Sequence, residues 1–447
     1  MLKKIQRAVR AMMPGAAAIE LPEPQVLERD QHSISRKQIS KNALSVLYDL
    51  NKAGHEAYLV GGCIRDLLLG GHPKDFDIAT DATPEQALKL FRRARIIGRR
   101  FRIVHVRMGR EVIEVTTFRG AHDSAANTSQ QTDEGMLLRD NVFGSLRDDA
   151  LRRDFTVNAL YYTVDGFRLL DYAGGLEDLR KRTLRMIGDP EQRYREDPVR
   201  MLRAIRFAAK LDFSIEAKTA APLAELSAQL QQVAPARLFD EIVKLFMSGQ
   251  GERVFELLCE HALFAPLFPA SAEALAAGDQ QGKRLIECAL ANTDLRIAEE
   301  KPVTPAFLYA SLLWPAFKAG QQQAEQASMP AWQARQRAGQ LAIEQQLAII
   351  TIPKRFSVPM REIWNLQHNL EVAQGRRARS LLGHPRFRAA YDFLLMRENA
   401  GEQLERSAGF WTDLQLEHPD TEVRKDRDPP KPRRRRRGGA RRKPTAP

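Results

Sequence analysis

The sequence predicts an α+β protein in which a head with a mixed sheet and helices precedes an all-helical neck and body and a disordered basic tail. Strand signals gather in the first half, where residues 103–108 and 111–117 alternate in polarity around Gly109 and indicate an antiparallel hairpin. Beyond Asp212 the strand signals fade and apolar side chains recur at helical spacing. The helical patterns cover residues 238–246, 254–268, 305–314, 335–350 and 387–396. Their Phe, Leu and Trp stripes predict helix-packing core, not base-stacking platforms.

Proline, serine and threonine residues indicate where the first helices of the chain begin or are interrupted. Several prolines interrupt residues 1–38, so this segment is expected to be weakly ordered. A helix beginning after Ser35 or Ser40 leads into a strand that ends at Val60. A further helix begins at the sequence Thr-Pro-Glu at residues 83–85, which is typical of an N-cap followed by proline at the first helical position.

Two carboxylates at alternate positions, Asp75 and Asp77, are the most distinctive chemical feature of the head. Side chains two residues apart on an extended segment point to the same side, so Phe76 and Ile78 would anchor the opposite face in a core. Paired carboxylates on a rigid strand suit divalent cations, which prefer oxygen ligands and bridge phosphates. A DxD sequence alone is also common on surface turns.

Two glycines and an arginine precede these acids. Gly61 and Gly62 allow a backbone to approach a phosphate and Arg65 offers a bidentate phosphate contact, although a glycine pair alone usually marks a tight turn. Neither a P-loop nor a dinucleotide fingerprint is present. The order strand, GG, Arg-Asp helix, break and DxD resembles the nucleotidyltransferase head of the DNA polymerase β superfamily. Within it, GGxxRDxxLG followed by KDFDIAT is similar to the branch that holds tRNA CCA-adding enzymes and bacterial poly(A) polymerases. The resemblance implies two Mg²⁺ ions at Asp75 and Asp77, with Mn²⁺ as an alternative metal.

A third acid is expected near the metals, and two residues compete for the role. Glu114 lies inside an apolar strand, where it either joins the metal site or pairs with a basic side chain such as Arg119. The stretch LRRDFTVNALYY at residues 151–162 resembles the family's RRDxTxNA element. By that resemblance Asp154 completes the catalytic acids and Arg153 contacts the incoming triphosphate.

The sequence REDPVRMLRAIRF at residues 195–207 reads as a helix with an arginine stripe. Such a stripe is commonly a solvated face. Here the EDxxRxLRAxRF spacing is similar to the family's nucleotide-recognition helix. By that resemblance Asp197 and Arg200, with Arg203 nearby, hydrogen-bond the edge of the base, so that the protein and not a template selects the nucleotide. Aspartate offers acceptors and arginine offers donors, which is the complement that a base edge requires.

The positive charge of the chain is concentrated at its C-terminal end. The formal net charge is +13, and residues 424–447 hold twelve Lys or Arg against two Asp, which is about +10. A segment of this composition is expected to be disordered and to bind RNA phosphates without sequence preference, unless it is merely a solvated tail. The RNA-binding candidates in its unbroken run are Arg433, Arg434, Arg435, Arg436 and Arg437.

Cysteine usage and hydropathy predict the compartment. The three cysteines, Cys63, Cys259 and Cys288, are far apart and suit neither a disulfide framework nor a zinc site, which fits a reducing cytoplasm. No run of 18 or more apolar residues is present, so no transmembrane helix is expected. The basic, mildly amphipathic segment 1–20 either frays or makes a peripheral membrane contact.

The expected organisation has five parts. These are a weakly ordered segment (1–38), the nucleotidyltransferase head (39–185), a helical neck with the nucleotide-recognition helix (186–250), a helical RNA-binding body (251–415) and the arginine-rich tail (416–447).

Within the branch, the sequence favours a template-independent poly(A) polymerase that adds AMP from ATP to RNA 3′ ends and promotes RNA turnover. The segment IIGRRFRIVHV at residues 96–106 resembles the one that marks bacterial poly(A) polymerases, and no HD-type phosphohydrolase pattern is visible. The alternative is a CCA-adding tRNA nucleotidyltransferase, and a remote one is a non-catalytic RNA-binding protein. Family resemblance further implies contact with the RNA-decay machinery and an RNA chaperone, and a monomer is the default expectation.

Overall fold

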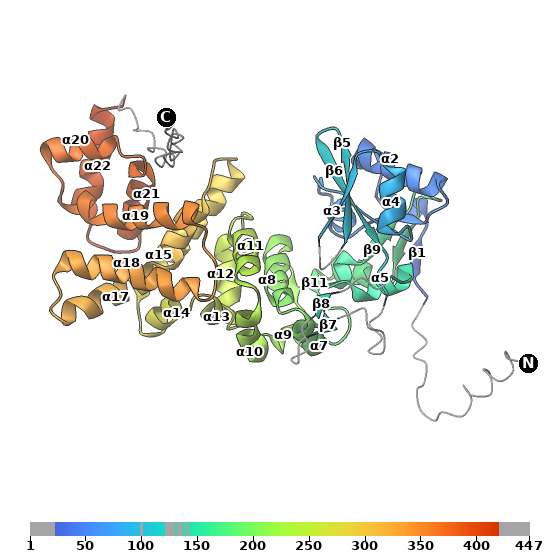
Figure 1. Cartoon of the computed structure of the whole chain (residues 1–447), viewed down its shortest axis with the longest axis horizontal. Coiled ribbons are helices and arrows are strands. Elements are labelled where there is room, and N and C mark those ends of the chain that lie inside the picture. The colour runs from blue at the N-terminus through green and yellow to red at the C-terminus, as the bar shows by residue number, and fades with distance from the viewer. Residues whose placement is uncertain (1–22, 99–101, 121–129, 132–136, 140–142, 420–447) are drawn as a thin grey trace, which may run out of the picture. The chain divides into compact units, whose positions relative to one another are not determined.

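The computed structural model describes residues 23–98, 102–120, 130–131, 137–139 and 143–419. The chain divides into two compact units, Met1–Leu267 and Phe268–Pro447 (Figure 1). The predicted RNA-binding run Arg433–Arg437 and the segment 1–20 lie outside the described residues. The finer division into head, neck, body and tail stays a prediction.

The first unit is built on an eight-stranded mixed sheet. Its strands are β1 (Gln25–Leu27), β2 (Ala57–Val60), β3 (Asp77–Thr80), β4 (Ala94–Ile97), β5 (Ile103–Met108), β6 (Glu111–Thr117), β9 (Leu160–Tyr162) and β10 (Leu169–Asp171). They lie in the order β1-β10-β9-β2-β3-β6-β5-β4. The pair β3 and β6 is parallel and the other neighbouring pairs are antiparallel, including the predicted β5–β6 hairpin. Two small sheets pair β7 (Gln130–Gln131) with β8 (Leu137–Arg139) and β11 (Thr183–Leu184) with β12 (Ser214–Ile215).

Strand β1 differs from the weak order expected from the sequence in the part of residues 1–38 that the structure describes. Val26 lies opposite Leu170, so β1 extends the edge of the sheet beside β10. Residues 29–31 and 36–38 form short 3₁₀ turns. The prolines near residues 22–24 break helices, but they do not prevent a short strand whose register is supplied by β10 far along the chain.

Short helices surround the sheet and continue beyond it. They are α2 (Lys41–Lys52), α3 (Gly62–Leu68), α4 (Pro84–Leu90), α5 (Leu146–Arg152), α6 (Gly175–Arg180), α7 (Pro190–Glu196), α8 (Val199–Leu211), α9 (Ala217–Ala220), α10 (Leu223–Leu226), α11 (Pro235–Phe246), α12 (Gly251–Glu260) and α13 (Phe264–Leu267). Ser40 caps α2 by accepting hydrogen bonds from Asn42 N and Ala43 N. The predicted cap of α4 is confirmed, since Thr83 accepts from Gln86 N and Pro84 occupies the first turn.

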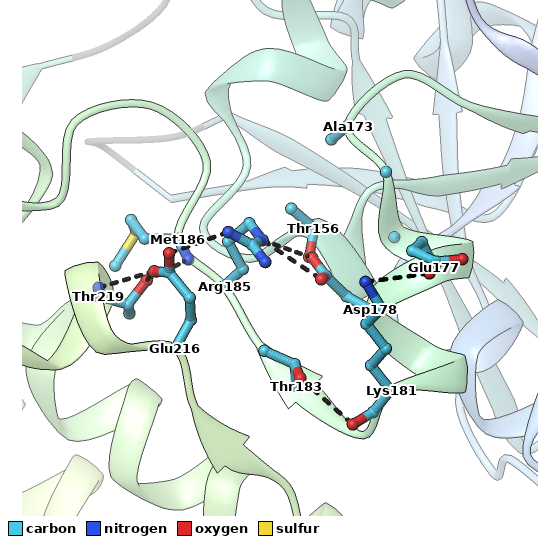
Figure 2. A network of polar contacts seen from close by, with 12 residues as sticks. Thr156, Ala173, Glu177, Asp178, Lys181, Thr183, Arg185, Met186, Glu216 and Thr219 are labelled. Carbon is cyan, nitrogen blue, oxygen red and sulfur yellow. Dashed lines mark hydrogen bonds and ion pairs between the residues drawn. The ribbon is translucent and has the colours of Figure 1, made fainter.

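A polar network joins the segment that follows Asp154 to α6 and to the start of α9 (Figure 2). Arg185 Nε donates to Asp178 Oδ2 at 3.1 Å, and its Nη1 donates to Glu216 Oε1 at 2.9 Å. Thr156, two residues after Asp154, donates to the buried carboxylate of Asp178 at 2.6 Å. The network therefore fixes the backbone beside a predicted catalytic acid to α6 and to the start of α9.

The second unit is helical throughout its described part, as predicted. Its helices are α14 (Pro269–Ala276), α15 (Gln280–Ala298), α16 (Pro305–Leu312), α17 (Trp314–Gln326), α18 (Ala331–Leu347), α19 (Lys354–Val372), α20 (Gly375–Leu382), α21 (Phe387–Asn399) and α22 (Glu405–Glu417). Phe317 stacks between Trp314 and Trp364, with ring centroids 4.9 Å and 5.1 Å away. These rings are buried, so the aromatic stripes form core. Among the described residues, no helix is long and apolar enough to cross a membrane.

Candidate active site

The two predicted metal-binding carboxylates stand at the start of β3. Asp77 is the first residue of the strand and pairs with Val60 at the end of β2, while Asp75 lies just before it. Phe76 and Ile78 are buried, whereas Asp75 and Asp77 are exposed. The period-two alternation therefore holds across the strand start and leaves both carboxylates on the solvent side.

Glu114 is the acid that lies directly beside Asp77. The two residues are register partners on the parallel strands β3 and β6, so their side chains leave the sheet on the same face. His105 Nε2 lies 3.2 Å from Glu114 Oε1. Asp77 reaches solvent only through the cavities that it lines, and the surrounding protein removes enough water from its carboxylate to raise the pKa to about 6; the negative charges of Glu114 and Asp75 add to the rise.

This concentration of negative charge bears on metal binding. Among the described residues, no group of three His, Cys, Asp or Glu side chains is arranged to hold a metal ion. The donors nevertheless fit a hard divalent cation, because Asp75, Asp77 and Glu114 are carboxylates and Asp77 is crowded by like charge. A bound cation would relieve this repulsion.

The glycine pair and Arg65 occupy the turn between β2 and α3. Gly61 has a φ of +80°, a backbone conformation that side chains with a Cβ rarely adopt. Arg65 is only 2% exposed, and its guanidinium donates to Asp66 Oδ1 at 2.6 Å and to Asn158 Oδ1 at 2.5 Å. Arg65 therefore fixes α3 to the segment after Asp154 through its hydrogen bond to Asn158.

Arg153 is held by two residues that the sequence analysis did not single out. Its Nη2 donates to Asp149 Oδ2 at 2.9 Å and its Nε donates to the Tyr161 hydroxyl at 2.7 Å. Tyr161 in turn donates to Asp149 at 2.6 Å. Burial opposes ionisation of Asp149, but the charge of Arg153 and the hydrogen bonds to the carboxylate together outweigh it, so the pKa of Asp149 lies below its usual value. The i, i+4 spacing of Asp149 and Arg153 is the one local signal of this pair.

The carboxylate of Asp154 forms an ion pair with Arg203. The Nε of Arg203 donates to Asp154 Oδ2 at 2.7 Å, and Asn158 donates to Asp154 Oδ1 at 3.1 Å. Burial alone would raise the pKa of Asp154, but the charge of Arg203 and the hydrogen bonds outweigh it and lower the pKa to about 2. Asp154 is thus ionised and orients Arg203, and it is not among the acids that raise the pKa of Asp77.

The predicted base-reading residues lie at a break between two helices. The expected continuous helix over residues 195–207 is wrong at its start, because α7 ends at Glu196 and α8 begins at Val199 after Pro198. Asp197 sits in this break and receives two hydrogen bonds of 2.8 Å from Arg237 on α11. Arg200 donates to Glu196 at 2.8 Å. Arg237 and Glu196 were not predicted.

Two adjoining cavities connect these groups. The first, of about 440 Å³, is lined by Glu114, Asp197, Arg200 and Arg237 among others. The second, of about 600 Å³, is lined by Gly61, Gly62, Arg65 and Asp75 among others. The residues that line both are Asp77, Arg153, Asp154 and Arg203. The fold therefore brings every predicted site residue in the described part of the chain to one of two cavities that meet at Asp77.

Comparison with known proteins identifies related families over most of the chain. Family models match as the poly A polymerase head domain (residues 57–185), the probable RNA and SrmB-binding site of polymerase A (212–275) and the polymerase A arginine-rich C-terminus (327–443). The chain is 48% identical over 437 residues to poly(A) polymerase I of Escherichia coli O6:H1, covering 96% of this chain and 94% of that protein. It is 45% identical over 398 residues to poly(A) polymerase I of Haemophilus influenzae, covering 88% of each.

More distant relatives share the fold. A CCA-adding enzyme of Enterococcus faecalis is 41% identical over 207 residues, which cover 46% of this chain and 49% of that enzyme. Among solved structures, a tRNA nucleotidyltransferase complexed with a primer tRNA and an incoming ATP analog matches with a TM-score of 0.58 and 22% identity, covering 83% of this chain and 98% of that one. The Bacillus stearothermophilus CCA-adding enzyme in complex with CTP matches with a TM-score of 0.55 and 24% identity, covering 85% and 83%. These two structural matches support the fold alone.

Proposed function

The chain belongs to the bacterial poly(A) polymerase I family, and we propose that it adds AMP from ATP to RNA 3′ ends without a template and releases pyrophosphate. The observation that carries this function is 48% identity with poly(A) polymerase I across 96% of the chain. The CCA-adding relative matches less than half of the chain, so that activity is the less favoured alternative. The reaction would feed RNA turnover.

The residues that line the two cavities support separate proposed roles in binding the base, the triphosphate and the metal ions. Asp197 and Arg200 would read the adenine edge, and Arg153 would orient the triphosphate. Asp75 and Asp77 would hold Mg²⁺, with Mn²⁺ as an alternative, and Glu114 would be the third carboxylate beside them. When bound, two such ions supply activation of the RNA 3′-hydroxyl and neutralisation of the leaving pyrophosphate. Asp154 would keep Arg203 aimed at the nucleotide.

The compartment, the further RNA contacts and the protein partners are also proposals. The three cysteines, Cys63, Cys259 and Cys288, form no disulfide, which is compatible with action in a reducing cytoplasm. The run Arg433–Arg437 would contribute a sequence-independent grip on RNA. The family model over residues 212–275 is described as a probable RNA and SrmB-binding site, which supports the proposal that RNA is bound there. An association with the RNA-decay machinery is proposed from the family resemblance alone.

The test offers each of the four nucleoside triphosphates separately, with magnesium, to an unstructured RNA and to a tRNA lacking its CCA end. A long ladder with ATP on both RNAs, and little product with CTP, is the expected result. Addition of two C and one A to the tRNA alone would assign the chain to the CCA-adding enzymes. No incorporation of any nucleotide would leave the non-catalytic RNA-binding alternative.

A further inference from the structure

Arg193 connects two parts of the active site, although it lines neither cavity. It lies on α7, and its side chain is 11% exposed. Its Nη2 donates to the backbone carbonyl oxygens of Arg152 and Arg153, the second at 2.7 Å. Its Nη1 donates to Glu196 Oε2, also at 2.7 Å. The two arms of one guanidinium therefore hold two different segments of the chain.

The first arm of Arg193 caps the C-terminal end of α5. Arg152 is the last residue of that helix and Arg153 is its C-cap, so their carbonyl oxygens lie where the helix supplies no donor of its own. A guanidinium satisfies these oxygens and complements the negative end of the helix dipole. The cap fixes the direction in which the chain leaves α5. It therefore also fixes the positions from which Arg153 and Asp154 extend.

The second arm joins the same guanidinium to the predicted base-reading arginine. Glu196 Oε2 accepts a hydrogen bond from Arg193 Nη1 at 2.7 Å and another from Arg200 Nη1 at 2.8 Å. Arg200 Nη1 also donates to the backbone carbonyl oxygen of Arg193 at 2.7 Å. One carboxylate oxygen is thus shared by two guanidinium groups, which fixes the separation of Arg193 from an arginine that lines the first cavity.

This placement is unfavourable for the charge of Arg193 itself. Burial, and after it the charge of Arg200, lowers the pKa of Arg193 to about 10, although the carboxylate of Glu196 opposes the fall. The Nε of Arg193 is buried and has no hydrogen-bond partner in the described part of the chain. A buried ion pair often adds no more stability than apolar packing would, so the main consequence that we expect is the geometry that it imposes.

We propose that Arg193 is a positioning residue that couples recognition of the base to placement of the triphosphate. Through Glu196 it holds Arg200 at the first cavity, and through the end of α5 it holds Arg153 and Asp154, which line both cavities. A nucleotide whose base engages Arg200 then meets Arg153 at a fixed distance. A base that displaces Arg200 disturbs the shared carboxylate and, with it, Arg193. The inference rests on the proposed nucleotidyl transfer.

The experiment separates the two arms of Arg193. Arg193→Gln removes both, whereas Glu196→Gln removes only the ion pairs and leaves the carbonyl contacts of Arg193 in place. Steady-state assays on an unstructured RNA measure kcat and KM with ATP and, separately, with CTP. Both variants are expected to lower the selectivity for ATP over CTP about tenfold, as the loss of a hydrogen bond between charged groups implies. Only Arg193→Gln should also lower kcat with ATP about tenfold, because it alone releases the end of α5.

Arg193→Lys keeps the test informative if Arg193→Gln does not fold. The lysine keeps the positive charge beside Glu196, but a single ammonium cannot reproduce the fork that reaches two segments at once. This variant should therefore fold and still lose selectivity for ATP. Arg195→Gln is the matched control, because Arg195 lies on the same helix, lines neither cavity and pairs with Glu191 at the surface. Its kinetic constants should equal those of the wild type.

The double variant of Arg193→Gln with Glu196→Gln tests whether the two residues act together. If they do, its selectivity falls no further than that of the worse single variant. Multiplied losses would show that Arg193 does not act through Glu196 and would overturn the inference. Variants that unfold at a lower temperature but keep the selectivity and kcat of the wild type would overturn it too, since the role would then be structural only.

A binding measurement makes the test independent of the proposed reaction. Calorimetric titration with ATP and with CTP gives the ratio of the two affinities without turnover. A ratio that changes in Arg193→Lys supports the inference even if the wild type adds no AMP. An unchanged ratio overturns it, whatever the activity of the wild type.

Discussion

Arg237 donates two hydrogen bonds of 2.8 Å to the two carboxylate oxygens of Asp197, across a separation of 40 residues. A bidentate pair of this kind fixes the carboxylate in direction as well as in charge. Asp197 is 8% exposed and lies at a helix break, where Val199 N makes a longer hydrogen bond of 3.4 Å to its Oδ1. Arg237 is therefore the residue that positions the acceptor predicted to read the base.

We predict that Arg237→Gln lowers kcat/KM for ATP about 10- to 100-fold, the cost of losing hydrogen bonds to a charged group. Selectivity for ATP over CTP should fall with it, because Asp197 is then free to turn. Competition assays with paired triphosphates measure the ratio, and Arg253→Gln, which removes an exposed pair on α12, is the control. An equal loss for all four nucleotides would mean that Arg237 has a structural role only.

These contacts show where sequence reasoning succeeds and where it stops. The alternation at Asp75 and Asp77 is a local property of an extended chain, so it could be predicted from period two alone. The partner of Asp197 could not, because α11 is brought to the helix break by packing and not by any spacing in the sequence. Strand β1 was not predicted for the same reason, since three residues that follow a proline carry no strand signal without β10.

The ionised carboxylate of Asp77 is predicted to lower the free energy of unfolding when no metal is bound. Its pKa of about 6 in the folded chain lies above the value of about 3.9 for an unfolded chain. The penalty is therefore absent below about pH 4, grows as the pH rises and is complete above the folded pKa. In a chelator at neutral pH, Asp77→Asn should unfold at a higher temperature than the wild type and should add no AMP. Excess magnesium should stabilise only the wild type, and a variant less stable than the wild type in chelator would contradict this account.

Substitutions of Glu114 and Asp154 are predicted to affect activity in different ways. Glu114→Gln should raise the magnesium concentration for half-maximal activity about 10- to 100-fold, as loss of a group beside metal ligands commonly does. Asp154→Asn should lower kcat by releasing Arg203 and leave the magnesium requirement unchanged. Magnesium titrations of activity decide the matter. The reverse pattern would make Asp154 the third metal-proximal acid.

The ion pair of Asp154 should also appear in acid stability. Its folded-state pKa of about 2 lies below the unfolded value of about 3.9, so the stabilisation is complete above about pH 5 and is lost as the pH falls toward 2. The difference in pKa corresponds to about 2–3 kcal/mol. Thermal unfolding at a series of pH values should show the wild type more stable than Asp154→Asn at neutral pH and equal to it near the folded pKa. A pH-independent difference would point to packing instead of charge.

Two neighbouring tyrosines provide the sharpest test of how Arg153 is held. The Tyr161 hydroxyl accepts from Arg153 and donates to Asp149, and all three groups are largely removed from water. The Tyr162 hydroxyl is also buried, but it has no hydrogen-bond partner among the described residues. Tyr161→Phe should therefore destabilise the chain by about 1–2 kcal/mol and raise the KM for ATP, because two charged groups lose a shared partner.

Tyr162→Phe is the matched control, since it removes the same oxygen from the next residue of β9. Burying an unpaired hydroxyl costs free energy, so this variant should be as stable as the wild type or more stable, with an unchanged KM for ATP. Denaturant unfolding and steady-state kinetics on the two variants measure both effects. Equal losses in the two variants would show that β9 tolerates no change at either ring, and the hydroxyl of Tyr161 would then have no particular part in holding Arg153.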